Sequence, residues 1–207
     1  MLPRLILASS SIYRRELLAR LGFAFEVSSP GIDETPLPHE APQDTALRLA
    51  QAKAGVIAAR EPAALVIGSD QVATLNGQQI GKPGTHERAL AQLMSMRGQS
   101  VVFHTALCLA DGRDASVQSE NVQTTVRFRH LPEAELDAYL QIEKPYDCAG
   151  SAKNEGLGIA LIESLESSDP TALTGLPLIA LCSMLRRAGL PFFGRQPAAN
   201  AGSPRCF

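Results

Sequence analysis

The feature that most constrains the fold is the stretch Leu65–Val72, in which an apolar run ends in a glycine, a hydroxyl, a carboxylate and an amide. A short run of branched apolar residues is typical of a strand buried on both faces, as in the middle of an α/β sheet. We therefore expect Asp70 and Gln71 at the far end of the apolar run, where open α/β sheets bind their ligands. The alternative is that Asp70 only caps a turn after a core strand.

Composition is that of an ordinary globular protein. The 207 residues are 45% hydrophobic and 19% charged, enough for one substantial core but not for two large independent domains. We expect a single domain over residues 1–193, followed by a disordered tail at 194–207 that is rich in Pro, Ala, Gly and Ser. The formal net charge of −2 argues against a nucleic-acid-binding surface but allows a small anionic substrate.

Cysteine usage and hydropathy indicate the compartment. The four cysteines show no CxxC spacing, so we expect reduced thiols in a cytosolic protein rather than a disulfide framework or a zinc site. The apolar run Leu5–Ala8 near the start is too short for a signal peptide. No stretch of the sequence approaches the roughly 18 apolar residues of a membrane span. These patterns predict a soluble, cytoplasmic protein without a membrane partner.

Hydrophobic periodicity alternates between strand and helix patterns along the chain, which is typical of an α/β fold. Asn76-Gly77 marks a tight hairpin, and the turn at 111–114 joins two long strands as an antiparallel pair. The pattern predicts strands at 4–8, 23–27, 65–75, 78–80, 100–109, 116–128 and 159–162, and helices at 11–21, 44–60, 86–97, 132–143 and 176–188.

Basic side chains occur where helices could bind an anion. Arg14 and Arg15 lie in the first turn of a predicted helix, where the helix dipole disfavours cations by roughly 0.3–1 kcal/mol each. A bound anion would remove this conflict. The alternative, that both point into solvent, fits Arg14 less well because its spacing places it on the Leu17/Leu18 face. Lys53 lies beside the apolar stripe of the next predicted helix, where it either extends over the core edge or reaches a buried anion.

Loops supply the other candidate residues. Asp33 and Glu34 lie in a loop punctuated by proline and glycine; such loops often contain sites, and a solvated acid pair is the alternative. Lys82 stands in a rigid Gly-Lys-Pro-Gly loop. The segment 146–158 combines three glycines with Lys153 and Glu155, which suits a close approach of backbone to a ligand.

Several cations together with several carboxylates indicate a metal–phosphate substrate. Lysine and arginine bind phosphate oxygens, whereas clustered carboxylates repel one another unless a cation such as Mg²⁺ or Mn²⁺ lies between them. None of the four histidines lies in these stretches, and no Ser-His-Asp or Cys-His pattern occurs. We therefore expect a carboxylate that activates water rather than a covalent nucleophile. The candidate anion ligands are Ser9, Ser10, Arg14, Lys53, Lys82 and Lys153, and the candidate carboxylates are Asp33, Glu34, Asp70 and Glu155.

Six motifs, in order over residues 4–190, resemble those of the Maf family of nucleoside triphosphate pyrophosphatases. The resemblance implies an elongated, two-lobed α/β fold with a mixed sheet flanked by helices, like that of inosine triphosphate pyrophosphatases. It also implies a site in the cleft and often a homodimer. The motifs are Leu5–Ser11 with Arg14-Arg15, Asp33–Thr35, Ala52–Ala54, Gly68–Val72, Gly81–Pro83 and Gly175–Pro177.

Within the family, the sequence resembles the branch that acts on 7-methylguanosine triphosphate (m7GTP). Ser69–Gln71 and Cys148–Lys153 differ from the Ala-Asp-Thr-type motif and the Tyr-Gly-Ile-Gln-Gly-like loop of the thymidine and uridine triphosphate branch. Tyr13 stands where the m7GTP branch commonly has tryptophan. Its ring offers an aromatic face to a cationic methylated purine, although tyrosine stacks less strongly than tryptophan.

The resemblance implies hydrolysis between the α- and β-phosphates of a noncanonical nucleoside triphosphate, with m7GTP as the expected substrate, to the monophosphate and pyrophosphate. Asp70 would accept the proton of the attacking water, and Glu34 and Asp70 would bind a divalent cation, Mg²⁺ or Mn²⁺. Two alternatives stay open: a dTTP or UTP pyrophosphatase, and a nucleotide-binding regulator of cell division without turnover. Substrate contacts would come from Ser9, Ser10, Arg14, Lys53 and Lys82 at the phosphates and from Tyr13, Gln71 and Lys153 at the base.

Overall fold

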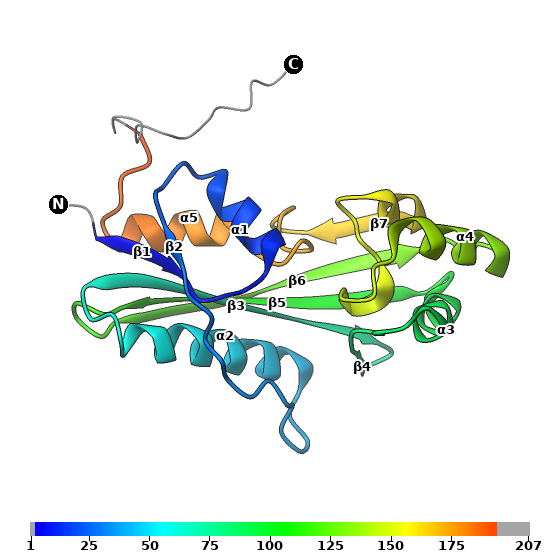
Figure 1. The fold of residues 1–207 in the computed structure, drawn as a ribbon, viewed down its shortest axis with the longest axis horizontal. Helices are drawn as coiled ribbons and strands as arrows, with labels where there is room; N and C mark the ends of the chain where they lie inside the picture. Colours follow the sequence, from blue (N-terminus) through cyan, green and yellow to red (C-terminus); the bar gives the residue numbers. More distant parts are fainter. Residues whose placement is uncertain (1–2, 194–207) are drawn as a thin grey trace.

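The computed structural model describes residues 3–193 and has a mixed α/β architecture. Its strands are β1 (Arg4–Leu7), β2 (Glu26–Val27), β3 (Ala64–Leu75), β4 (Gln78–Ile80), β5 (Ser100–Asp111), β6 (Val117–Phe128) and β7 (Ile162–Ser167). Its α-helices are α1 (Ile12–Ala19), α2 (Pro42–Ala58), α3 (His86–Met96), α4 (Glu133–Glu143) and α5 (Leu178–Arg187). In this described part, one seven-stranded sheet has the order β2-β1-β3-β5-β6-β7, with β4 paired to β3 (Figure 1). The expected mixed sheet flanked by helices is confirmed.

Three long strands give the molecule its elongated shape. β3, β5 and β6 have 12 residues each, and β3 and β5 are antiparallel over the whole register from Leu65↔Asp111 to Leu75↔Val101. The predicted antiparallel pair β5–β6 is confirmed. So is the hairpin at Asn76-Gly77, where both residues have positive φ, 50° and 77°, as a two-residue turn of the mirror-image type requires.

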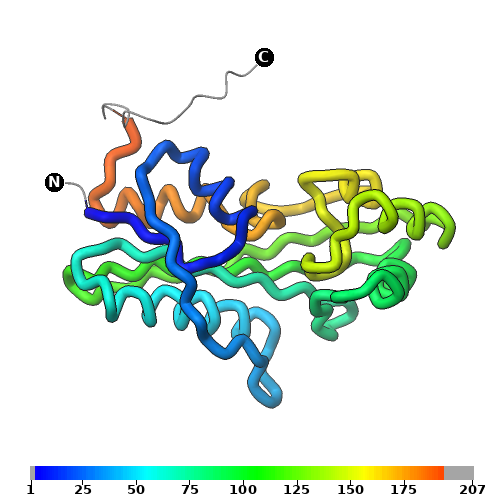
Figure 2. Tube along the Cα trace, in the orientation of Figure 1, coloured from blue at the N-terminus to red at the C-terminus, as the bar shows by residue number. Residues whose placement is uncertain are grey.

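Helices cover the two faces of the sheet unequally. Alternate β3 residues such as Leu65 and Ile67 pack with α1 and α5, which lie side by side although they come from opposite ends of the described chain (Figure 2). Farther along the same face, a second apolar cluster packs under α3 and α4. On the opposite face, Val66 packs against Ala50 and Ala54 of α2. The sheet therefore joins two halves, each with its own core.

The structure corrects two predicted strands. The strand predicted at 23–27 is reduced to β2, because Phe23 and Phe25 pack against the α1–α5 core instead of extending the ladder. The strand predicted at 159–162 is wrong over most of its length. Leu157–Leu161 forms a 3₁₀ helix, and β7 begins at Ile162. Here Gly156 and Gly158 both donate their backbone N–H to the Lys153 carbonyl at 3.0 Å, so the chain turns back too tightly to be extended.

Asp70 follows the apolar run, as expected, and lies inside the strand predicted at 65–75 rather than beyond its end. Asp70 lies in the interior of β3, because the antiparallel pairing with β5 continues past it to Leu75. The parallel pairing with β1, in contrast, stops at Leu7↔Ile67. Asp70 therefore follows the end of a neighbouring strand rather than the end of its own. No helix among the described residues is long and apolar enough to cross a membrane. The tail predicted at 194–207 lies outside the described residues.

Candidate active site

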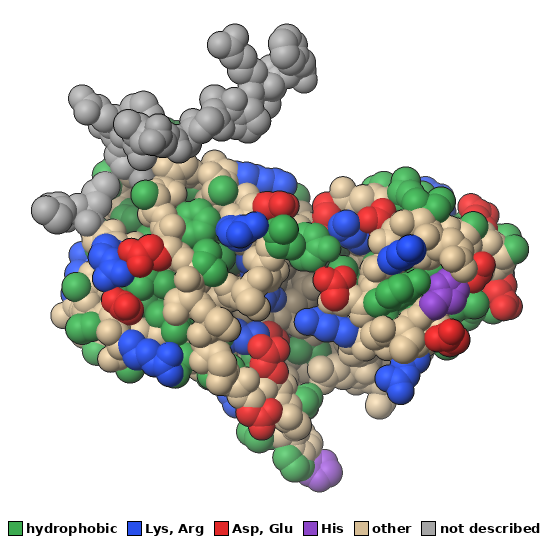
Figure 3. All heavy atoms as spheres, in the orientation of Figure 1, with side chains coloured by type: hydrophobic (Ala, Val, Ile, Leu, Met, Phe, Trp, Pro, Cys, Tyr) green, Lys and Arg blue, Asp and Glu red, His purple; other side chains and the backbone are tan. Residues whose placement is uncertain are grey.

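A cavity of about 640 Å³ lies between the two halves of the molecule. In the space-filling view, acidic and basic side chains surround a hollow between the halves (Figure 3). Most of the candidate residues line the cavity, although they come from widely separated segments of the chain. Lining residues predicted from the sequence are Ser9, Ser10, Tyr13, Arg14, Glu34, Lys53, Asp70, Gln71, Lys82 and Glu155.

An open edge of β3 forms the floor of this cavity. On the side of β3 opposite β5, β1 pairs with residues 64–67 and β4 pairs with residues 73–75, so residues 68–72 have no strand neighbour there in the described chain. Consecutive strand residues point to opposite faces of a sheet. Asp70 and Gln71 nevertheless line the same cavity, because the cavity extends around the open edge.

Lys53 links two carboxylates on this floor. Its Nζ lies 2.6 Å from Asp70 Oδ1 and 2.8 Å from Glu34 Oε1. The Lys53 side chain is 6% exposed and that of Asp70 10% exposed, whereas Glu34 is 56% exposed. Of the two sequence-based alternatives for Lys53, the structure supports the one in which it reaches a buried anion. A lysine paired in this way compensates the desolvation of the buried Asp70 carboxylate.

Close packing of α2 on β3 brings this pair together. A Cβ atom on Gly68 would lie 2.2 Å from the Ala50 carbonyl oxygen and 2.7 Å from the Ala54 nitrogen. Only glycine therefore allows α2 to approach β3 so closely at this point. The approach places Lys53 within hydrogen-bonding distance of Asp70, and this explains physically why a glycine stands two residues before the acid.

The start of α1 forms one wall. The Ser11 hydroxyl caps the helix by accepting from the Arg14 backbone N–H at 3.4 Å, and Ser9 Oγ accepts from the Ser11 N–H at 3.1 Å. The Arg14 side chain points inward, as its spacing predicted, and its Nε donates to the Gly175 carbonyl at 2.8 Å. Burial lowers the pKa of Arg14 from its ordinary value, and the carboxylates of Asp70 and Glu34 oppose this shift.

Gln71 holds a loop on the other face of the sheet. Its Nε2 donates to Thr105 Oγ1 at 2.9 Å, to the Ala172 carbonyl at 3.1 Å and to the Leu173 carbonyl at 3.0 Å. Ser69 Oγ lies 2.9 Å from the Gly175 carbonyl of the same loop. The Gln71 amide nitrogen is thus engaged by the protein, and the chain segment that it holds lines the cavity through Leu173–Gly175.

An aromatic side chain of α1 and a thiol of the loop 146–158 lie close together in the cavity wall. Tyr13 lines the cavity with Cys148, and burial raises the pKa of each to about 12, so both stay protonated at neutral pH. Lys153 does not line the cavity. Its Nζ pairs with Glu143 at 3.0 Å and lies 5.9 Å from the centre of the Tyr13 ring. Glu155 does line it, and burial raises the pKa of this carboxyl.

Three residues that organise the site are not among the predicted site residues, although Ser69 and Gly175 belong to motifs that the sequence analysis quotes. Ser69, Thr105 and Gly175 act through the loop 172–175, and this contact depends on strands brought together from distant segments. Glu155 was a candidate carboxylate without a stated role, and the structure places it in the cavity wall. Asp33 instead accepts from the Thr35 N–H at 2.9 Å, which agrees with its interpretation as a loop acid.

The carboxylates of Glu34 and Asp70 suit a divalent cation that also binds the phosphate oxygens of a ligand in the cavity. Among residues 3–193, no three His, Cys, Asp or Glu side chains lie close enough to hold a metal ion by themselves. Glu34 and Asp70 are nevertheless near enough to share the Lys53 ammonium. Two carboxylates plus phosphate oxygens and water are the usual ligand set of protein-bound Mg²⁺, so the residues present fit such an ion.

Fold and site together define an α/β protein with a cleft for a charged ligand at an open sheet edge. The chain belongs to the Maf-like protein family, whose sequence profile matches residues 4–188. It is 65% identical over 207 residues to a 7-methyl-GTP pyrophosphatase of Burkholderia pseudomallei (strain 1710b), covering 98% of this chain and 96% of that protein. Similar proteins of the same name come from Cupriavidus metallidurans (66% over 192 residues; 93% of this chain, 96% of that protein) and Burkholderia orbicola (67% over 194 residues; 92% of each).

Proposed function

We propose that the protein is a nucleoside triphosphate pyrophosphatase that converts m7GTP to m7GMP and pyrophosphate. The observation that best supports this is the Glu34–Lys53–Asp70 chain of charges on the floor of a cavity that Arg14 and Lys82 also line. Acidic and basic side chains in this arrangement suit the binding of a triphosphate together with its counter-ion. Relatives about two-thirds identical over nearly the whole chain bear the name 7-methyl-GTP pyrophosphatase.

In the proposed reaction, the residues of this chain bind the triphosphate and remove a proton from water. Arg14, Lys53 and Lys82, with the serines at 9 and 10, bind phosphate oxygens. Water attacks one of the two phosphorus atoms that share the α–β bridging oxygen, and the bond from that phosphorus to the bridging oxygen breaks. Asp70 accepts the proton of the water. The products are the monophosphate and pyrophosphate.

A divalent cation would be held by Glu34 and Asp70 together with the phosphates. When bound, it would offset the charge of the triphosphate and of the leaving group. Lys53 contacts both carboxylates, so it keeps them from repelling one another and stays in position to bind a phosphate oxygen.

The base is proposed to bind at the wall formed by Tyr13, Gln71 and the loop around Lys153. Tyr13 offers its ring face to a cationic methylated purine. Asp147 and Glu155 also line the cavity, and a positively charged base suits acidic neighbours. Because the Gln71 amide nitrogen already has three acceptors in the protein, the amide oxygen is the atom left for a donor on the base.

Two further parts of the proposal concern the protein in the cell. Cys108, Cys148 and Cys182 are free among the described residues, which supports the reducing cytoplasm as its location.

The family resemblance also leads us to propose a homodimer. Static light scattering would detect it directly, as twice the chain mass of 22.1 kDa.

A nucleotide panel tests the proposed function. Pyrophosphate release would be measured with m7GTP, GTP, dTTP and UTP, each in Mg²⁺ and in Mn²⁺. We expect kcat/KM to be highest for m7GTP and activity to need the divalent cation. Turnover of dTTP or UTP at least as fast as that of m7GTP would contradict the proposed base, and binding of nucleotide without any pyrophosphate release would contradict the enzyme.

A further inference from the structure

Within the Glu34–Lys53–Asp70 chain of charges, Glu34 is the residue that belongs to irregular backbone. It lies in the connection 28–41 between β2 and α2, which contains no helix or strand. Lys53 and Asp70, by contrast, are fixed in α2 and β3. The 56% exposed side chain of Glu34 has little packing around it. Other contacts must therefore hold this part of the connection against Lys53.

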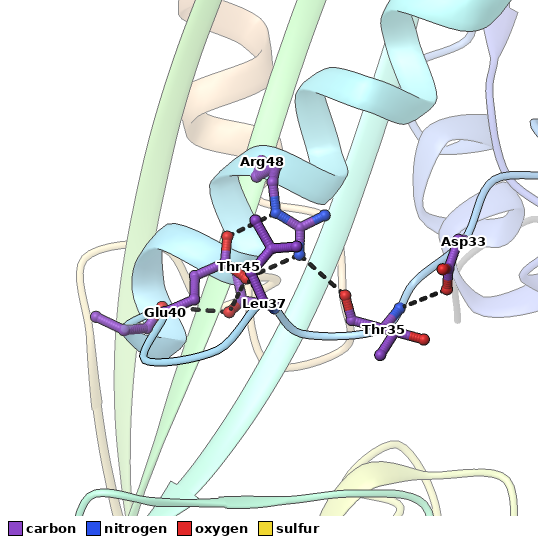
Figure 4. A network of polar contacts seen from close by, with 7 residues as sticks. Asp33, Thr35, Leu37, Glu40, Thr45 and Arg48 are labelled. Carbon is purple, nitrogen blue, oxygen red and sulfur yellow. Dashed lines mark hydrogen bonds and ion pairs between the residues drawn. The ribbon is translucent and has the colours of Figure 1, made fainter.

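A polar network centred on Arg48 and Glu40 makes these contacts (Figure 4). Arg48 donates from Nε to Glu40 Oε1 at 2.6 Å and from Nη2 to Glu40 Oε2 at 2.8 Å. Its Nη2 also donates to the backbone carbonyl of Thr35 at 3.2 Å. Glu40 accepts in addition from the Leu37 N–H at 3.0 Å and from the Thr45 hydroxyl at 2.8 Å. The residue that follows Glu34 is thus bonded to a side chain of α2.

The geometry and the burial of this network suit a rigid structural support. A bidentate arginine–carboxylate pair fixes both position and orientation, and the Glu40 side chain is only 10% exposed. The Arg48 guanidinium holds the pKa of Glu40 at about 2, so the pair stays charged at any working pH. Arg48 and Lys53 belong to the same helix. One helix therefore positions both the ammonium of the site and the backbone beside its exposed carboxylate.

We propose that Arg48 is a positioning residue for Glu34: braced by Glu40, it holds the Thr35 backbone so that Glu34 stays against Lys53. This inference rests on the proposed function, in which Glu34 helps to bind the cation and the triphosphate. Arg48 does not line the cavity, so its effect on the reaction passes through Glu34. Loss of such an outer partner typically lowers metal affinity or activity about 10- to 100-fold.

A double-mutant cycle tests the proposal. Pyrophosphate release would be measured as a function of Mg²⁺ concentration for the wild type, E34Q, R48Q and E34Q/R48Q, at a temperature where circular dichroism shows each variant to be folded. We expect R48Q to need about 10- to 100-fold more Mg²⁺ for half-maximal activity. We expect the double variant to be no worse than E34Q, because residues that act as a unit are not additive. Fully additive losses would overturn the proposal.

R113Q is a matched control. Arg113 forms an equally short bidentate pair with Asp111, at 2.8 and 2.6 Å, on the β5–β6 turn, and Arg113 does not line the cavity. We expect its Mg²⁺ dependence to match that of the wild type. Amide hydrogen exchange gives a readout without turnover: peptides covering residues 33–41 should exchange faster in R48Q and unchanged in R113Q. Unchanged exchange in R48Q would overturn the proposal.

The outcomes separate this inference from the proposed function. If E34Q is impaired while R48Q keeps both the wild-type activity and the wild-type Mg²⁺ dependence, the positioning role of Arg48 is wrong and the proposed function stands. If E34Q itself behaves as the wild type, the role given to Glu34 in the proposed function is wrong, and the role of Arg48 falls with it.

Discussion

At the scale of single residues, the central question is why a lysine lies between two acids. Lys53 and Asp70 are both buried, and their 2.6 Å contact pairs two groups that would otherwise be poorly solvated, while Glu34 meets the same lysine at 2.8 Å from the solvent side. Removing one partner of such a group leaves the other buried and uncompensated. Substitutions here should therefore keep the shape and the hydrogen bonding of the replaced side chain, so that loss of chemistry is separated from loss of folding.

Asp70→Asn tests the proposed proton acceptor. The amide keeps the shape and can still meet Lys53 through its oxygen, but it cannot take a proton from water. We expect kcat for m7GTP to fall by about 10²–10⁴-fold, the usual contribution of a general base, with nucleotide binding largely kept. Pyrophosphate release and isothermal titration calorimetry would measure the two quantities. Wild-type turnover in this variant would remove Asp70 from the mechanism.

At the scale of elements, the contact between α2 and β3 sets the geometry of the site. Gly68 lies under Ala50 and Ala54, where a Cβ would overlap the helix backbone. The other side of the same helix anchors the connection that contains Glu34, through Arg48. A shift of α2 would therefore disturb Lys53 and Glu34 together.

Gly68→Ala should separate α2 from β3. We expect a loss of unfolding free energy of about 1–3 kcal/mol, typical of overpacking in a core, and a loss of activity, because Lys53 moves away from Asp70. Gly55→Ala is the control, since this α2 glycine is exposed and a Cβ added there would have no atom within 4 Å. There alanine should stabilise the helix by up to about 1 kcal/mol. Denaturant unfolding would measure both, and equal stability of the two variants would contradict the packing argument.

The Glu40–Arg48 pair predicts a dependence of stability on acid pH. Hydrogen bonds from Arg48 lower the pKa of Glu40 from 4.5 to about 2. A carboxyl whose pKa is lowered in the folded state stabilises it fully above the unfolded pKa, and this stabilisation is lost as the pH falls through the folded pKa. We expect the wild type to have a higher Tm than E40Q at pH 6. The difference in Tm should shrink as the pH is lowered from about 4.5 to about 2. A difference that is constant with pH would contradict the pairing.

At the scale of the whole molecule, one sheet joins two halves that have separate apolar cores. The cavity between them receives Ser9 and Arg14 from one half and Lys82 from the loop after β4 in the other. A nucleotide bound there would contact both halves. Binding should therefore stabilise the molecule as a unit rather than one half alone.

Thermal unfolding of the Asp70→Asn variant with nucleotide would show this stabilisation. At a free ligand concentration 100 times Kd, a ligand that binds only the folded state adds about 2.7 kcal/mol. We expect a clear rise in Tm with m7GTP, a single transition, and a smaller rise with the same concentration of dTTP. An equal rise with dTTP would contradict the proposed base preference.

The sequence alone predicts much of the local structure and most of the candidate residues that the structure brings to the cavity. Apolar runs, turn signals and helical spacing identify the long strands and all the α-helices of the described residues within a few positions, because these patterns reflect local backbone geometry. Polar residues that interrupt apolar runs, such as Asp70 after Leu65–Ile67, mark candidate site positions, and Asp70 does line the cavity. The family motifs then connect Arg14, Lys53 and Lys82 with a triphosphate.

Only the tertiary structure decides how those residues meet. It leaves Asp70 at an open edge of β3, since pairing with β5 continues where pairing with β1 stops. It turns Lys153 toward Glu143 and puts Glu155 in the cavity wall. It also brings Arg48 to the backbone beside Glu34. These outcomes depend on register and on contacts between segments far apart in the chain, and no local pattern encodes them, because side-chain spacing fixes a face of an element but not its neighbour.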